Sequence, residues 1–336
     1  MRLLASVIIP TRNRCGALER TLRALWEQTV GLRRFEVIVV DNVSTDETPL
    51  AVERLRAQSP VPLKYCRMDE DRGPAGARNQ GTRLADGSHL LFLDSDVQLD
   101  PRWIATATEY LQRNPGVGIV AGKLLYAARP ARINMFGGEL SRIGLAWDAD
   151  EGEPSATVDC LKERLWAPSS AVMIRRRVLQ DVGLFDDTFY FGFEDSDFGW
   201  RANLAGYRCV CLPDLVALHH ATPSGRTAGR TIVFHYAKNR LRSMLKNYST
   251  GSLAKYIPLY MIYAVGEMLV RPSRRERLKA LAWNVTALPD TWRERGRIQH
   301  LRRRRDAELA RYFSSRLLPA KTLARRRKDE WTLLHS

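Results

Sequence analysis

Residues 89–96 read His-Leu-Leu-Phe-Leu-Asp-Ser-Asp, and this stretch decides the fold of the chain. The mostly apolar run at residues 89–93 is typical of a short strand buried on both faces of a parallel sheet. Asp94 and Asp96 follow at the carboxyl end, where open α/β sheets bind ligands. Two such carboxylates can face one crevice and suit Mg²⁺ or Mn²⁺ carrying substrate phosphates. The alternative is a polar turn before a helix that begins at Asp100-Pro101.

Similar apolar runs precede this stretch. Residues 4–10 and 35–40 predict two further buried strands. A helical pattern follows each strand, at residues 11–28 and 44–57, and Ser44-Thr45-Asp46-Glu47 has the form of a capping box. Strands and helices in alternation indicate βαβ units and a parallel sheet.

A glycine-bearing loop, GPAGARN at residues 73–79, follows another predicted strand at residues 63–67. The loop starts a helix, so its backbone N–H groups and Arg78 could hold an anion. The alternative is an ordinary turn with a surface arginine.

A second acidic cluster, Glu194-Asp195-Ser196-Asp197, follows an aromatic run about a hundred residues after the first. Carboxylates cost several kcal/mol to desolvate, so their position against apolar segments indicates a cation, hydrogen bonds or a catalytic role. The two acidic clusters together predict an active site. Asp197 and Arg201 are one helical turn apart and could form a structural pair.

Several motifs in order resemble the inverting glycosyltransferases of family 2, which have a GT-A fold. The motifs are VIIPTRNR from residue 7, VVDNVSTDET from 39, GPAGARNQG from 73, LLFLDSDV from 90, FDDTFYFGFEDSDFGWRANLAGY from 185 and LPDLVALHH from 212. The resemblance spans roughly residues 3–250. It implies an enzyme that moves a sugar from a nucleotide-diphosphate donor to an acceptor.

The same resemblance implies an α/β, Rossmann-like and mostly parallel central sheet flanked by helices. We expect a catalytic domain at residues 1–250, with a nucleotide-sugar half at about 1–122 and an acceptor half at about 123–250. A basic, partly amphipathic helical tail would follow at residues 251–336.

The resemblance also implies site residues. It assigns donor binding to Pro10, Thr11, Arg12, Asp41, Arg78 and Asp94. Thr11 and Asp41 would line the nucleobase and ribose pocket, and Arg78 would face the pyrophosphate. For Asp41, the alternative is a turn former at a strand end.

Asp94, Asp96 and His219 would hold Mg²⁺ or Mn²⁺, and the ion would neutralise charge on the departing nucleotide. His219 could instead be structural, and an irregular segment would let His220 exchange roles with it. Asp195 matches the catalytic base of the family, with helix capping as its alternative. Glu194 would orient the acceptor or the loop.

One segment departs from the family pattern. Residues 166–171, WAPSSA, stand where many relatives have a glycine-rich or cysteine-bearing stretch, which puts the sugar and acceptor contacts of this loop in doubt. Gly137-Gly138 and Trp147 lie in the preceding variable segment and could form an acceptor loop, although glycine pairs are usually turns.

Other classes fit less well. The one G-x-G, at residues 116–118, feeds a predicted strand rather than a helix, and there is no P-loop motif. The five cysteines lack C-x-x-C spacing, which argues against structural zinc and a disulfide framework and fits a reducing cytosol. The chain opens directly into a strand, with no signal peptide before it.

The basic charge is concentrated near the end of the chain. Residues 271–336 contain 19 Lys or Arg and 7 Asp or Glu, which gives +12 of the net +16. The mostly apolar stretch at residues 256–270 precedes them, and at 15 residues with Pro258 and Glu267 we expect it to be too short to cross a membrane. An interfacial helix beside Arg302–Arg305 and Arg325–Lys328 would explain both features. A helical hairpin packed on the catalytic domain and a nucleic-acid patch are the alternatives, the latter disfavoured because tyrosines and leucines accompany the charge.

These observations predict a metal-dependent inverting glycosyltransferase, cytoplasmic and peripheral on the inner face of the membrane, that builds cell-surface polysaccharide or glycolipid. Resemblance to rhamnosyltransferase-like members implies a UDP- or dTDP-sugar donor, with rhamnose as a candidate, and a saccharide or polyprenyl-linked saccharide acceptor. The alternatives are a nucleotidyltransferase using the same crevice and a noncatalytic scaffold that binds membrane or nucleic acid.

Overall fold

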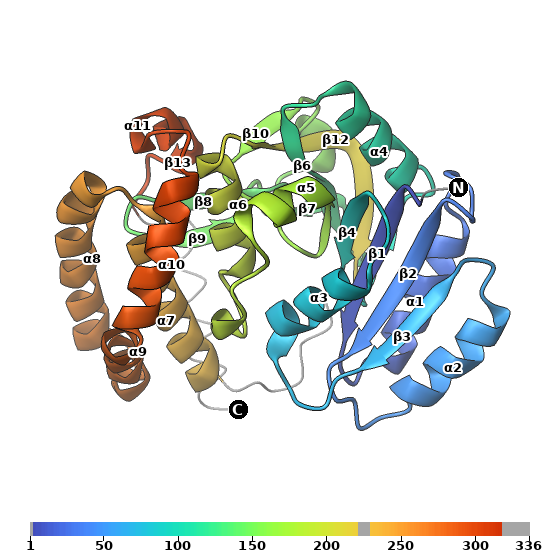
Figure 1. Cartoon of the computed structure of the whole chain (residues 1–336), viewed down its shortest axis with the longest axis horizontal. Coiled ribbons are helices and arrows are strands. Elements are labelled where there is room, and N and C mark those ends of the chain that lie inside the picture. The colour runs from blue at the N-terminus through green and yellow to red at the C-terminus, as the bar shows by residue number, and fades with distance from the viewer. Residues whose placement is uncertain (1–2, 221–228, 318–336) are drawn as a thin grey trace.

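A mixed ten-stranded sheet runs through the centre of the molecule, with helices on both of its faces (Figure 1). The structure is a computed structural model and describes residues 3–220 and 229–317. The strands of the sheet are β1 (Ala5–Thr11), β2 (Phe35–Asp41), β3 (Leu63–Arg67), β4 (His89–Leu93), β5 (Val97–Leu99), β6 (Val117–Tyr126), β7 (Arg129–Met135), β10 (Lys162–Arg164), β11 (Ala171–Arg175) and β12 (Arg208–His219).

The helices of the first part are α1 (Cys15–Trp26), α2 (Thr48–Gln58), α3 (Gly73–Leu84), α4 (Trp103–Arg113), α5 (Arg176–Val182) and α6 (Glu194–Leu204). Four longer helices follow: α7 (Gly229–Asn247), α8 (Thr250–Val270), α9 (Arg274–Thr286) and α10 (Leu288–Leu301). The short helix α11 (Asp306–Leu309) comes last. A small second sheet joins β8 (Gly138–Ser141) to β9 (Ala146–Asp148) and to β13 (Phe313–Ser314).

The sheet has the strand order β10-β12-β6-β11-β4-β1-β2-β3, with β5 beside β12 and β7 beside β6. Strand β1 pairs in parallel with both β2 and β4, and β3 continues this parallel half beyond β2. Strand β11 is antiparallel to β4 and to β6, and so joins the two halves of the sheet. The predicted α/β architecture with a mostly parallel sheet is confirmed.

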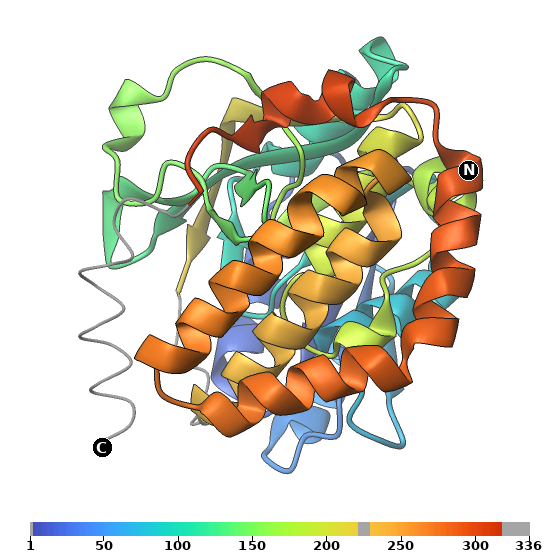
Figure 2. The same ribbon diagram turned by 90° about the vertical axis from the view of Figure 1, so that its left-hand side faces the viewer.

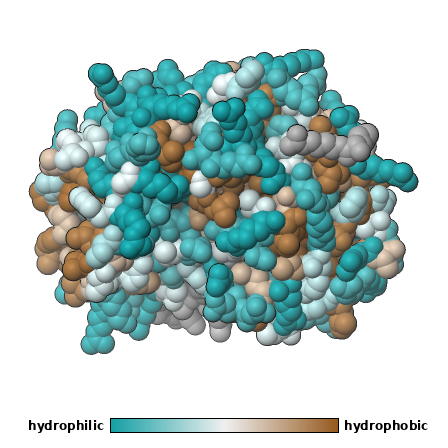
Figure 3. Space-filling model, in the orientation of Figure 1, coloured by the Kyte–Doolittle hydropathy of each residue, from teal (hydrophilic) through white to brown (hydrophobic). Residues whose placement is uncertain are grey.

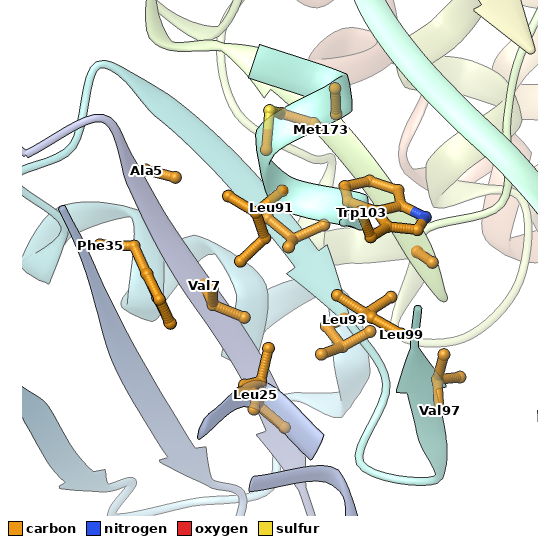
Figure 4. Close-up of a cluster of buried hydrophobic side chains, with 14 of the residues drawn as sticks. Ala5, Val7, Leu25, Phe35, Leu91, Leu93, Val97, Leu99, Trp103 and Met173 are labelled. Atoms are coloured by element: carbon orange, nitrogen blue, oxygen red, sulfur yellow. The ribbon is translucent and has the colours of Figure 1, made fainter. Parts of the chain in front are cut away.

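The central strands are apolar on both faces because helices cover both sides. In β4, Leu91 and Leu93 enter one core, and Leu90 and Phe92 enter the other. Figure 4 shows the first core, where Leu91 and Leu93 lie near Trp103. Burial on both faces is what a parallel sheet between helical layers requires. This burial also fixes the position of the carboxyl end of β4, and Asp94 is the residue that follows it.

Two helix starts differ from the expectation. The pattern at residues 11–28 forms a helix only from Cys15, because Asn13 has a left-handed backbone (φ 52°). The predicted capping box is wrong: α2 starts at Thr48, whose N–H donates to Asp46 Oδ1 (3.0 Å). Ser44 instead accepts a hydrogen bond from the Asn13 N–H through its hydroxyl (2.9 Å). These loop residues hold the β1 and β2 ends together rather than capping a helix.

The C-terminal helices lie on one side of the molecule. Figure 2 shows α8 running alongside α7, with α9 and α10 completing a helical layer. The apolar stretch is longer than expected, because the helix starts at Thr250 and α8 has 21 residues. Within the described residues, α8 is the one helix that is long and apolar enough to cross a membrane by length and composition. The expectation that this segment is too short is therefore wrong on length.

The first arginine run contacts protein as well as solvent. Arg302 pairs with Asp306 (2.7 Å), and Arg304 Nη2 donates to the Gly206 carbonyl (2.8 Å). Arg303 and Arg305 are exposed. Arg304 therefore fixes the tail just beyond the end of α6, as the alternative of a packed helical tail predicted, whereas Arg302 pairs within the tail. Residues 325–328 lie outside the described residues.

Candidate active site

Arg78 joins the two acidic clusters. Its side chain is buried, Nη2 donates to Asp94 Oδ1 (2.8 Å) and Nη1 donates to Glu194 Oε1 (2.9 Å). One guanidinium therefore holds carboxylates that lie 16 and 116 positions from it in sequence. The two acidic clusters that were predicted to form one site therefore both contact Arg78. The guanidinium of Arg78 binds these carboxylates, whereas the sequence predicted that it would be free to bind an anion.

Asp94 is held by the segment that departs from the family pattern. Its backbone N–H donates to the Ser170 carbonyl (3.0 Å), and its Oδ2 accepts from the Ser170 hydroxyl (2.6 Å). Strand β11 starts at the next residue and pairs with β4, so the sheet itself sets this contact. Ser170 is thus a supporting residue that the motif did not reveal.

Asp96 faces His219 across the crevice. The two come together because β5 and the end of β12 pair, with His219 opposite Val97. His219 Nε2 lies 3.5 Å from Asp96 Oδ1, and Arg14 Nη1 lies 2.5 Å from Asp96 Oδ2. The other ring nitrogen, Nδ1, lies 2.7 Å from Asn134 Oδ1. An amide oxygen only accepts, so in the neutral ring Nδ1 carries the proton and the Nε2 lone pair points toward Asp96.

This tautomer is the one that a metal-binding histidine adopts when a neighbouring group holds its second nitrogen. His220 turns away and contacts Gln98 Oε1 (2.6 Å). The part of the chain that the structure describes contains no group of three His, Cys, Asp or Glu side chains gathered around one point. Asp96 and His219 form a pair, whereas Asp94 is turned to Arg78. The predicted set Asp94, Asp96 and His219 is therefore only partly assembled.

Glu194 and Asp195 open helix α6 after a strained turn. Tyr190 and Phe193 both have positive φ (59° and 72°), a conformation that costs free energy in non-glycine residues. The turn packs tightly against the start of α3, since a Cβ at Gly73 would lie 2.3 Å from the Tyr190 carbonyl oxygen. Only glycine lets α3 start so close to this turn. The turn aims the first residues of α6 at Arg78.

The Asp195 carboxyl is poorly neutralised. Burial is the largest cause that raises its pKa, and the neighbouring Glu194 carboxylate adds to it, while Arg78 opposes both; the pKa is raised to about 8. Its side chain still reaches the surface in part, and Oδ1 accepts from the Ser196 N–H (2.7 Å). A carboxyl with a pKa near neutrality in a crevice can take up a proton, as a general base must.

The proposed nucleobase contact of Asp41 is not supported by its surroundings. Asp41 is completely buried, and its two oxygens accept from the Ser44 N–H and the Tyr65 hydroxyl (both 2.7 Å). These contacts are those of a turn former at a strand end, and the nucleobase contact stays a prediction. Thr11 is buried beside it, and its hydroxyl has no partner within the described ranges.

The carboxylate at this end of the crevice is Asp71. It pairs with the half-exposed Arg12, and accepts from Asn42 Nδ2 (2.6 Å) and from the Tyr190 hydroxyl (2.7 Å). Asp71 lies directly before the glycine-bearing loop, which was the one signal in the sequence that could have drawn attention to it. Pro10 lies partly exposed at the end of β1.

The variable segment before residue 166 also supplies a carboxylate. Gly138 and Trp147 fall in the β8–β9 hairpin, which ends at Asp148. Burial and then the Glu151 carboxylate raise the pKa of Asp148 to about 6, and its charge is also felt by Asp195. The hairpin therefore brings an acidic side chain toward the base candidate. Sequence reasoning singled out this segment but missed Asp148.

Asp197 has the structural role considered for it. It is completely buried, with Oδ2 accepting from Arg201 Nε (2.8 Å) and Lys246 Nζ 3.1 Å from Oδ1. These cations lower its pKa against the opposing effect of burial. The predicted pairing of Asp197 with Arg201 is confirmed.

The arrangement joins three chemical functions in one crevice. Asp96 and His219 lie side by side, burial raises the pKa of Asp195 to about 8, and Arg78 joins Asp94 to Glu194. Such a site can hold a charged leaving group at one end and deprotonate a hydroxyl at the other.

Comparison with known proteins agrees with this geometry. Residues 6–137 match the family described as Glycosyl transferase family 2. The chain is 30% identical over 230 residues to the O-antigen biosynthesis protein RfbC of Myxococcus xanthus, covering 66% of the chain but only 18% of that protein. It is 28% identical over 223 residues to glycosyltransferase AglE of Haloferax volcanii, covering 66% of the chain and 68% of that protein.

Among solved structures, the mannosyltransferase PcManGT from Pyrobaculum calidifontis, in complex with GDP-Man and Mn²⁺, shares the fold. The TM-score is 0.55 at 20% identity, over 90% of this chain and 86% of that one. Residues 6–137 are therefore similar to glycosyl transferase family 2, and the chain shares the fold of this solved mannosyltransferase.

Proposed function

We propose that the protein is a metal-dependent, inverting glycosyltransferase that moves a sugar from a nucleotide-diphosphate donor to a hydroxyl of a saccharide or lipid-linked saccharide. The observation that carries the proposal is the Arg78 bridge, because it places Glu194 and its neighbour Asp195 opposite Asp94 in one crevice. A base and a leaving-group site then lie on either side of the space for the sugar. The donor we propose is a UDP- or dTDP-sugar, with rhamnose as a candidate.

The residues present fit a divalent cation. Mg²⁺ and Mn²⁺ in such sites usually take one or two protein ligands together with substrate phosphates and water. Asp96 and the Nε2 of His219 would supply the protein ligands, with Asn134 fixing the histidine ring. When bound, the ion would neutralise negative charge on the departing nucleotide diphosphate.

The remaining roles belong to side chains already placed. Asp195 takes the proton of the acceptor hydroxyl as that oxygen attacks the anomeric carbon, and Arg78 and Glu194 position it. One base and one displacement invert the configuration at that carbon. Thr11 and Glu194 each keep a buried oxygen without a partner among the described residues, which suits contact with a polar ligand.

The protein would act at the cytoplasmic face of a membrane, in the synthesis of cell-surface polysaccharide or glycolipid. The surplus of basic residues after residue 270 supports this location. Nucleic acid is not the partner we propose, because apolar side chains accompany these charges.

A donor panel tests the proposal. Full-length protein is incubated with Mg²⁺ or Mn²⁺ and with UDP-, dTDP- or GDP-sugars, and the melting temperature and slow donor hydrolysis are followed. A bound donor at a hundredfold excess over its dissociation constant stabilises the fold by about 2.7 kcal/mol. We expect one donor to stabilise the protein, to be hydrolysed to the nucleoside diphosphate, and to lose both effects in chelator.

The product separates the alternatives. Release of pyrophosphate from a nucleoside triphosphate would identify a nucleotidyltransferase instead. Donor binding without any turnover, in protein that is folded, would favour the noncatalytic scaffold.

A further inference from the structure

Helix α8 exposes an apolar stripe to solvent. Its exposed large side chains recur every three or four residues, at Leu259, Ile262, Val265 and Leu269. Ile262 and Leu269 are 71% and 69% exposed, and only 11% of the most apolar window of the helix is buried. Figure 3 shows apolar surface at the left edge of the molecule, where Figure 1 places α8. A stripe of this kind marks an interaction surface.

The opposite side of α8 is packed and carries its one acidic residue. Tyr260 and Ala264 are buried in the core shared with α7. Glu267 is 10% exposed and pairs with Arg240 of α7 (3.5 Å), Arg271 (3.2 Å) and Arg277 (3.7 Å). The single carboxylate of the helix is therefore neutralised on the inner side, and the outer stripe has no negative charge.

The charges around the stripe are basic at both ends. Lys255 is exposed near the start of α8, and Arg274, Arg275 and Lys279 are exposed at the start of α9. A second copy of the chain is a poor occupant, because two-fold pairing of antiparallel α8 helices would place these basic ends against each other. Lipid phosphates are complementary to them, and acyl chains are complementary to the stripe.

We propose that α8 lies in the plane of an anionic lipid bilayer as the docking element of this protein. Ile262, Val265 and Leu269 would enter the boundary between headgroups and acyl chains, and Lys255, Arg274 and Arg275 would contact lipid phosphates. This deepens the membrane location given under the proposed function. The helix lies flat rather than crossing, since crossing would separate Glu267 from Arg240 and expose both to hydrocarbon.

Vesicle flotation of the full chain tests the inference. We expect binding to phosphatidylcholine vesicles that contain phosphatidylglycerol, and much weaker binding to phosphatidylcholine alone. The double variant Ile262→Glu/Leu269→Glu should bind at least about tenfold more weakly. Leu50→Glu is the matched control, because Leu50 is 75% exposed on α2, and it should bind like the wild type.

The double variant Lys255→Glu/Arg275→Glu tests the contribution of the basic residues to vesicle binding. Each basic residue near an anionic surface contributes about 1 kcal/mol, so binding to the anionic vesicles should fall about tenfold or more. The control Arg33→Glu/Arg83→Glu makes the same change in net charge at exposed positions of the nucleotide-binding half and should have little effect.

Four outcomes would overturn the inference. The wild type could fail to float with anionic vesicles, or Ile262→Glu/Leu269→Glu could float equally well. Light scattering could instead show a dimer that this variant dissociates, which would make the stripe a contact between copies. Retention in membranes of expressing cells after an alkaline carbonate wash would show a spanning helix, whereas release supports the proposal.

Donor hydrolysis measured on the same samples keeps the two proposals apart. The α8 variants leave the crevice intact and should hydrolyse the donor at the wild-type rate. Vesicle binding without hydrolysis would contradict the glycosyltransferase and leave the docking element standing. Hydrolysis without vesicle binding would contradict the docking element and support the glycosyltransferase.

Discussion

The first turn of α6 carries one aspartate on each of two sides, and the two sides shift the pKa of the carboxyl in opposite directions. On the crevice side, Asp195 has Arg78 as the nearby cation, and that guanidinium is shared with two other carboxylates. On the inner side, Asp197 is held by Arg201 and Lys246. Two residues apart, the first has a raised pKa and the second a lowered one.

The difference lies in the local balance of charge rather than in burial. The inner side belongs to an ionic cluster in which three cations face three carboxylates, namely Arg201, Arg242 and Lys246 with Asp186, Asp197 and Asp290. Asp186 and Asp197 each contact two of the cations, which lower the pKa of both. The crevice has more carboxylates than cations. A structural carboxylate is thus neutralised by cations in direct contact with it, whereas a base requires a deficit of cations, which leaves it able to take a proton.

The largest expected effect comes from removing the base. Asp195→Asn keeps the size of the side chain but cannot accept the acceptor proton, so transfer should slow by a factor of about 10² to 10⁴. Stopped transfer assays measure the rate, and thermal shift with donor checks that binding survives. Near-normal transfer by a folded, donor-binding variant would contradict the role of Asp195.

The same substitution on the inner side should act on folding. Asp197→Asn leaves Lys246 and Arg201 less neutralised in a buried site, and breaking a buried pair costs about 3 kcal/mol or more. Urea unfolding measures the loss. Asp187→Asn, at an exposed position, is the control and should change the free energy of unfolding by less than about 0.5 kcal/mol. Equal urea midpoints for the two variants would show that the cluster does not stabilise the fold.

A smaller effect should distinguish the two histidines at the crevice. Asn134→Ala removes the partner of His219 Nδ1, and loss of such a partner typically costs 10 to 100-fold in metal affinity or activity, so the Mn²⁺ concentration for half-maximal donor hydrolysis should rise by about this factor. Gln98→Ala removes the partner of His220 and should leave that concentration unchanged. The reverse pattern would assign the metal to His220.

The parallel half of the fold was predictable because each strand carries its own evidence. Residues 63–67 form β3 as predicted, and the run that ends at Leu93 forms β4. β4 is decided by its apolar run and by burial on two faces, whereas β3 lies at the edge of the sheet and is only partly buried. The start of α2 was not predictable from the local pattern, because the Ser44 hydroxyl accepts a hydrogen bond from Asn13 of another loop instead of capping the helix.

The site was predictable only where a motif marked it. Asp96, His219 and Asp195 were named from ordered motifs, and the structure places Asp96 beside His219 and Asp195 near Arg78, which also holds Asp94. Ser170 and Asp71 were missed because their significance lies in contacts with distant residues. Ser170 meets Asp94 across 76 positions of sequence, and nothing in its own neighbourhood indicates this.

The smallest expected effect is a pH dependence of opposite sign in the two α6 variants. The folded pKa of Asp195 is raised, so its contribution to stability is complete below its unfolded pKa, near 4, and is lost as the pH rises toward about 8. Asn mimics the protonated form. The melting temperature of Asp195→Asn should therefore match the wild type at low pH and exceed it by a few degrees near pH 8.

The folded pKa of Asp197 is lowered, so its contribution is present above pH 4 and is lost as the pH falls below that value. The deficit of Asp197→Asn should therefore shrink toward low pH, whereas the gain of Asp195→Asn grows toward high pH. Melting curves from pH 3 to 9 measure both, with Asp187→Asn as a flat reference. Parallel curves for the two variants would mean that the two sides of α6 share one electrostatic environment, and the assignment of base and structural anion would fail together.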